Sequence, residues 1–181
     1  MPRKKFCLLI LFTLLACLCA AQEQGLAFQP GRRGTLGFGY GIPYGGYGFS
    51  VDMYVFDQIA LTVDVGTFMY AAGYELGIKY LRGNSASLWR PQVVLLYGVN
   101  GIIPYTNADV TQTEVFNGIT AGLGSQFMFG QKRKHGLDVG ATFVVSSGLF
   151  KRLEELSGYE FDVSSRLGFY LGYRYAFEFR Y

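Results

Sequence analysis

The sequence predicts an all-β protein, an eight-stranded antiparallel up-and-down transmembrane β-barrel with both termini on the periplasmic side. Apolar residues alternate with small or polar residues in eight segments, as lipid-facing and lumen-facing residues do in barrel strands. Half of the residues are apolar, yet after residue 21 no apolar run approaches the about 20 residues of a membrane-spanning helix. The N-terminus also has the pattern of an export signal.

Residues 1–21 are predicted to be a signal peptide. Arg3, Lys4 and Lys5 precede an apolar run over residues 6–19, which is too short to cross a bilayer as a helix. Cleavage is expected after Ala21, because small residues precede that position. The remaining chain divides into an N-terminal periplasmic segment, 22–33, and the barrel domain, 34–181.

The three cysteines and the excess of positive charge both lie in this N-terminal region. A loose lipobox over 14–17 leaves open a rival cleavage that would lipidate Cys17. Cleavage after residue 21 removes every cysteine, which excludes disulfides, a thiol nucleophile and a cysteine-ligated metal. It also leaves 13 basic against 13 acidic side chains, so the composition does not favour a nucleic-acid partner, and no cofactor is predicted.

The first four strands follow one another through short connections. The first strand is expected over residues 35–42, followed by a tight turn at 43–45, and a second tight turn is expected at 57–58. The outward-facing positions are Leu36, Phe38, Tyr40 and Ile42, then Tyr47, Phe49, Val51, Met53 and Val55, then Ile59, Leu61, Val63 and Val65, and then Tyr74, Leu76, Ile78 and Tyr80.

The last four strands have less regular connections. In the fifth strand, Pro91 requires a bulge or a position at the strand start. The polar stretches over 100–114 and 148–160 are predicted to be long outer loops. A basic turn at 131–136 is predicted to join the sixth and seventh strands. The outward positions are Trp89, Val93, Leu95 and Tyr97, then Ile119, Ala121, Leu123, Phe127 and Phe129, then Leu137, Val139, Ala141, Phe143 and Val145 opposite an inward Ser146, and every second residue from Leu167 to Tyr181.

The chain ends in aromatic residues at every second position: Tyr173, Tyr175, Phe177, Phe179 and Tyr181. This ending resembles the C-terminal signal recognised by the barrel assembly machinery of the outer membrane. Together with the export signal and the eight strands, it makes the chain resemble the OmpA/OmpX-type family of small outer-membrane barrels. The resemblance implies export to the outer membrane of a Gram-negative-type bacterium. The sequence departs from the family in its very short first two outer loops.

A soluble barrel such as a lipocalin has the same two-residue period, with the apolar face pointing inward. The size of the side chains favours the membrane alternative. The face opposite the bulky aromatic residues consists largely of glycine, serine and threonine with a few charges. Such residues fit the narrow interior of an eight-stranded barrel, whereas a soluble exterior would carry more lysine and less glycine.

The inward-facing charges are predicted to form ion pairs that plug the lumen. Unpaired charges in so confined a space would cost several kcal/mol, and the two signs nearly balance. Eight strands leave little open bore, so a proton relay or a conducting pore is the less favoured alternative. The predicted network comprises Asp52, Asp64, Glu75, Lys79, Arg90, Asp138, Arg174, Glu178 and Arg180.

No catalytic or metal site is predicted. The single histidine, His135, lies in the basic turn expected at the periplasmic side, away from Ser146 and Ser147 near the outer end of the seventh strand. The Glu154-Glu155 pair is interpreted as a solvated charge run. The glycines over 37–41 lie within a strand, where the nucleotide-binding fingerprint does not occur.

The expected function is therefore that of a non-enzymatic outer-membrane barrel with a charge-plugged lumen. It would contribute to envelope integrity, or present residues 100–114 and 148–160 to an extracellular ligand for adhesion or partner binding. Its other expected partners are outer-membrane lipid and, during insertion, the barrel assembly machinery. A surface-facing lipid-modifying enzyme and a narrow pore are the alternatives.

Overall fold

The computed structural model describes residues 33–83, 87–107, 110–130, 132–157 and 166–178. Within them the chain forms a closed antiparallel barrel in which each strand pairs with its neighbours in sequence and β1 pairs with β8. The predicted eight-stranded up-and-down barrel is confirmed. The strands are β1 (Arg33–Gly41), β2 (Gly46–Phe56), β3 (Ile59–Thr67), β4 (Ala72–Leu81), β5 (Trp89–Asn107), β6 (Val110–Phe129), β7 (His135–Ser147) and β8 (Leu167–Glu178).

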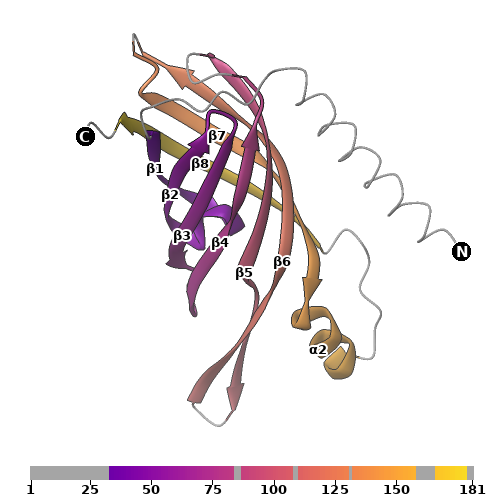
Figure 1. The fold of residues 1–181 in the computed structure, drawn as a ribbon. Coiled ribbons are helices and arrows are strands. Elements are labelled where there is room, and N and C mark those ends of the chain that lie inside the picture. The colour runs from indigo at the N-terminus through magenta and orange to yellow at the C-terminus, as the bar shows by residue number, and fades with distance from the viewer. Residues whose placement is uncertain (1–32, 84–86, 108–109, 131, 158–165, 179–181) are drawn as a thin grey trace, which may run out of the picture.

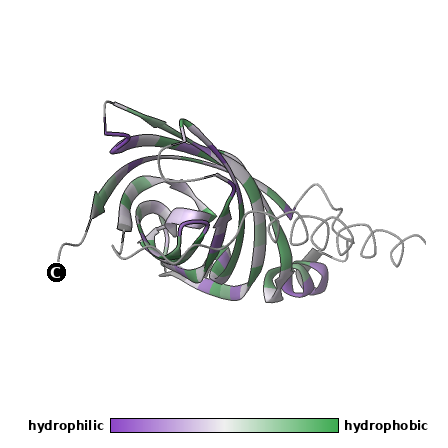
Figure 2. Ribbon diagram, turned by 45° about the horizontal axis from the view of Figure 1, so that its top comes forward, coloured by the Kyte–Doolittle hydropathy of each residue, from purple (hydrophilic) through white to green (hydrophobic). Residues whose placement is uncertain are grey.

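The two faces of the barrel wall differ in chemistry, as Figure 2 shows by the alternating colours along the strands. Bulky apolar side chains remain exposed on the outside, whereas charged and hydroxyl side chains are buried inside. In β2, for example, alternate residues are buried and exposed along most of the strand. The distribution is the inverse of that in a soluble protein, in which charged residues are rarely buried.

The connection between β1 and β2 differs from the prediction. The first strand ends at Gly41, and Ile42 belongs to a short 3₁₀ helix, η1 (Ile42–Tyr44). Gly41 and Gly45 have φ angles of 115° and 62°, conformations that glycine adopts without strain. They turn η1 inward, so Tyr44 is fully buried instead of lying in an exposed turn.

The prediction of a long third outer loop is wrong for most of its residues. Residues 100–107 and 110–114 continue β5 and β6, which pair as far as Asn107 and Val110. Figure 1 shows this hairpin projecting well past the rest of the barrel. Pairing is favourable where β-branched residues face each other, as Ile102 and Val115 do.

The predicted fourth outer loop begins as a helix, α2 (Gly148–Ser157); residues 158–160 lie outside the described part of the chain. At the end of β7, the register shifts so that Thr120 pairs with Val144 and Ile119 with Ser146. The extra residue at this bulge reverses the facing of the strand end. Val144 keeps the inward parity of Thr142 and is buried, whereas Val145 and Ser146 are both exposed, which corrects the prediction that Ser146 faces inward.

Candidate functional site

Arg174 on β8 lies at the centre of the lumen. Its Nε lies 2.6 Å from a carboxylate oxygen of Asp138 on β7, and its Nη1 lies 2.5 Å from one of Asp52 on β2. The Nζ of Lys79 on β4 lies 2.7 Å from the other oxygen of Asp52. All four side chains are fully buried. Two cations and two carboxylates thus form one connected chain across the barrel.

Hydroxyl groups complete the hydrogen bonds of this cluster. Thr35 Oγ1 donates to Asp52 at 2.9 Å. Ser50 Oγ accepts from Lys79 Nζ at 3.3 Å and from Arg174 Nη2 at 3.2 Å. Buried ion pairs are tolerated when further hydrogen bonds satisfy the remaining lone pairs and protons, and these residues supply such bonds.

Tyr44 enters the cluster from η1. Its hydroxyl donates to Asp138 at 3.0 Å, and its ring centroid lies 5.4 Å from the Arg174 guanidinium carbon. A Cβ at Gly172 would lie 2.2 Å from the Tyr44 hydroxyl, so this glycine leaves the space that the phenol fills. Sequence reasoning missed Tyr44; Pro43 and Gly45 beside it indicate a turn but not its inward direction.

Gln92 and Tyr170 extend the cluster toward β5 and β8. Gln92 Nε2 donates to Asp138 and, at 2.9 Å, to the Tyr170 hydroxyl. The hydroxyl of Tyr170 would collide with a Cβ at Gly124 or Gly140. Large inward side chains therefore occupy the space left by inward glycines in the middle of the lumen.

Asp64 and Glu75 belong to the predicted network but form no ion pair with its cations among the described residues. They face each other as a cross-strand pair of β3 and β4, and both are fully buried. Thr62 donates to Asp64 Oδ1 at 3.1 Å, while Asp64 Oδ2 and both oxygens of Glu75 have no hydrogen-bond partner among the described residues. Two carboxylates so placed cannot both be ionised without a large electrostatic cost.

Replacing Glu75 by glutamine should therefore raise the free energy of unfolding by about 1 kcal/mol, because the new amide can donate a hydrogen bond to Asp64. The measurement is a urea titration of the barrel in lipid vesicles, followed by the fluorescence of Trp89. Asp52→Asn, which alters an equally buried but paired carboxylate, should lower the stability. A clear loss of stability in E75Q would contradict this assignment.

Arg90 and Glu178, two further residues of the predicted network, lie toward the end of the barrel where β1 begins and β8 ends. Arg90 does not join Asp52 or Asp138; it donates to the Tyr54 hydroxyl at 3.3 Å and to the backbone oxygen of Asp57 at 2.8 Å. Glu178 ends β8, opposite Arg33, and its side chain lies outside the described part of the structure, as does Arg180.

Aromatic side chains surround the outer wall at this same end. Tyr173 and Tyr175 of the predicted assembly signal are exposed there, while Phe179 and Tyr181 lie outside the described residues. The ring of His135 stacks on Phe129 and bonds to the Tyr173 hydroxyl. His135 therefore faces outward within an aromatic group, far along β7 from Ser146 and Ser147 at the strand's other end.

The opposite end carries the hairpin of β5 and β6 with α2 against its base. Leu149 of α2 lies over Gly101, where a Cβ would come within 2.7 Å of it. Arg152 makes two hydrogen bonds to Glu114, at 3.0 and 3.1 Å, and a further ion pair to Glu155 at 3.6 Å. The two predicted outer segments thus form one unit instead of two separate loops.

The described residues contain no group of three histidine, cysteine, aspartate or glutamate side chains able to hold a metal ion. The same part of the chain has no helix that is both long and apolar enough to span a bilayer.

Comparison with known proteins gives one structural neighbour. No family model and no curated protein sequence matches the chain. The fold is similar to the crystal structure of the N-terminal β-barrel domain of Pseudomonas aeruginosa OprF, with a TM-score of 0.52 and 15% sequence identity. The match covers 82% of this chain and 98% of that domain, so the likeness extends over the whole barrel.

Proposed function

We propose that this chain is a non-enzymatic outer-membrane β-barrel whose lumen is closed by buried ion pairs. The observation that carries this proposal is the reversed distribution of polarity: the barrel exposes a continuous apolar face and buries Asp52, Lys79, Asp138 and Arg174. An apolar exterior of this extent matches the lipid-facing band of transmembrane barrels. The similarity in fold to the OprF barrel domain supports the same architecture.

The proposed route to the membrane follows from the ends of the chain. A signal peptide over residues 1–21 would direct export, and residues 22–33 would remain in the periplasm of a Gram-negative-type bacterium. The barrel assembly machinery would then recognise the aromatic residues at the end of β8. Since Arg33 and Glu178 pair at one end of the barrel, both termini would lie on the periplasmic side.

The hairpin of β5 and β6 would then project from the cell surface, together with α2. Among the described residues, the hairpin beyond Gly118 pairs with no strand other than its own partner. Unpaired strand edges can bind a further strand. We therefore assign envelope integrity to the closed barrel, and adhesion or partner binding to the surface unit of residues 100–114 and α2.

The test combines two measurements on the full chain expressed in a Gram-negative host. The folded barrel in isolated outer membranes should migrate faster in gel electrophoresis before boiling than after it. Trypsin added to intact cells should cut within α2 at Lys151 or Arg152 and leave the barrel core intact. Recovery of a heat-insensitive protein in the soluble fraction would overturn the proposal.

A further inference from the structure

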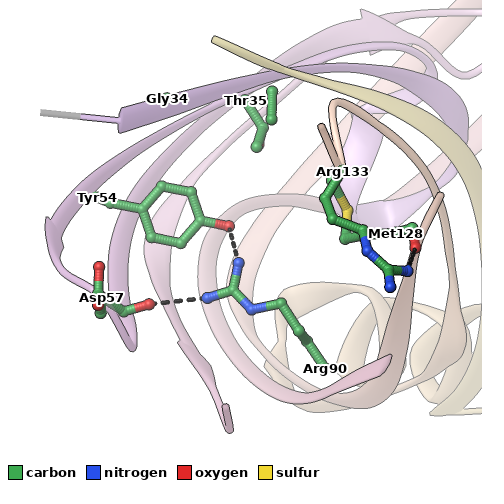
Figure 3. Close-up of a pocket in the computed structure, with 8 residues that line it drawn as sticks. Gly34, Thr35, Tyr54, Asp57, Arg90, Met128 and Arg133 are labelled. Carbon is green, nitrogen blue, oxygen red and sulfur yellow. Dashed lines mark hydrogen bonds between the residues drawn. The ribbon is translucent and has the colours of Figure 1, made fainter. Parts of the chain in front are cut away.

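A small pocket opens at the end of the barrel where β1 begins and β8 ends. Its volume is about 30 Å³, which gives room for about two water-sized groups. Figure 3 shows the guanidinium group of Arg90 beside Tyr54 and Asp57 and that of Arg133 beside Met128. The lining residues are Gly34, Thr35, Tyr54, Asp57, Arg90, Met128, Arg133 and Ala176.

Arg90 carries a buried charge without a counter-charge among the described residues. It is only 4% exposed, and its hydrogen-bond partners, the Tyr54 hydroxyl and the Asp57 backbone oxygen, are neutral. Its Nε has no acceptor in the described structure. A guanidinium does not lose its proton in proteins, and an unpaired buried charge costs several kcal/mol. The barrel therefore holds a cation that an anion would stabilise.

Arg133 adds a second guanidinium to the same pocket. It adopts a left-handed conformation, with a φ of 50°, in the turn between β6 and β7, where its amide donates to the Gly130 oxygen at 3.1 Å. Its Nη1 donates to the Met128 backbone oxygen at 3.0 Å, which is again a neutral partner. This turn directs the side chain over the mouth of the barrel.

The charges lining the pocket leave an excess of one positive charge. Asp57 is the single carboxylate among the lining residues, and no ion pair joins it to either arginine in the described structure. Thr35 is already bonded to Asp52. One negative charge brought into the pocket would thus neutralise it, and guanidinium groups bind the paired oxygens of carboxylates and phosphates with particular geometric fit.

We infer that Arg90 and Arg133 form a binding site for a singly charged oxyanion. The ligand would place two oxygens between the guanidinium groups, one of them accepting from Arg90 Nε. Two phosphate-containing ligands have the required oxyanion at this end of the barrel: free phosphate and the phosphodiester of an anionic lipid headgroup. The pocket is a property of the barrel itself, so its binding can be tested whether or not the proposed cellular location is correct.

The test follows the arginine Nε–H signals of the isotope-labelled full-length mature barrel by NMR. In one arm, inorganic phosphate is titrated into barrels in zwitterionic phosphatidylcholine nanodiscs at constant ionic strength. In the other, phosphatidylglycerol replaces part of the phosphatidylcholine without added phosphate. A saturable shift of the Arg90 signal in the first arm identifies free phosphate, and a shift in the second arm identifies the lipid headgroup.

Two variants and one internal control make the result specific. R133M should weaken binding about ten-fold, because it removes one charged hydrogen-bonding group while leaving the barrel wall intact. The Nε signal of Arg152, already paired with Glu114, should not shift and serves as the internal control. No saturable Arg90 shift in either arm would overturn the proposal. Binding that appears only in E178Q would also overturn it, because the Glu178 carboxylate would then be the resident partner.

Discussion

Replacing Arg174 by methionine should lower the free energy of unfolding by about 3–5 kcal/mol, the usual cost of removing one partner from a buried ion pair. The guanidinium bridges Asp52 and Asp138, and all three side chains are fully buried. Methionine fills much of the volume but leaves both carboxylates facing each other with less positive charge between them. The measurement is the midpoint and slope of a urea titration in lipid vesicles.

Two further variants separate loss of charge from loss of shape. Arg174→Lys keeps the charge but cannot bond to both carboxylates with a rigid fork, so its stability should lie between those of the wild type and R174M. Arg152→Met removes an arginine whose ion pairs lie at the surface, and such pairs contribute little. If R174M unfolds at the same urea concentration as R152M, the central ion pairs do not hold the barrel together.

Replacing Leu123 by arginine should destabilise the inserted barrel by about 2–4 kcal/mol, the cost of placing arginine on the lipid face at the bilayer midplane. Leu123 is 67% exposed and lies midway along the part of β6 that pairs with β7. In a soluble barrel the same substitution would replace an exposed apolar side chain with an exposed charged one and would hardly change the free energy of unfolding. The substitution therefore separates the two environments directly.

Val115→Arg is the matched control on the same strand and the same face. Val115 is 45% exposed, but it pairs only with Ile102 on the hairpin beyond the barrel. V115R should change the free energy of unfolding little, because the lipid-facing part of the proposed transmembrane barrel ends before this position. Equal effects of L123R and V115R in vesicles would contradict the membrane assignment, and equal folding of both in plain buffer would support a soluble barrel.

The facing of most side chains was predictable because it depends on a local property of the chain. Successive residues of a strand point to opposite faces, so one parity assigned to the lipid determines the rest of a regular strand. Asp52, Lys79, Asp138 and Arg174 are all found inside as expected. Ser146 departs from the pattern because a bulge changes the parity within β7. The residue types at this position do not indicate a bulge.

The strand count, the antiparallel order and the two unlike faces of the wall were predictable from the sequence alone, since they follow from alternation and short connections. Which charges meet depends on the folded barrel. The register of the closed sheet sets Asp64 opposite Glu75, brings Arg174 between Asp52 and Asp138, and leaves Arg90 beside the pocket at the barrel's end. Arg174 on β8 reaches Asp52 on β2 through the pairing of β1 with β8 that closes the barrel, a contact between residues more than a hundred positions apart.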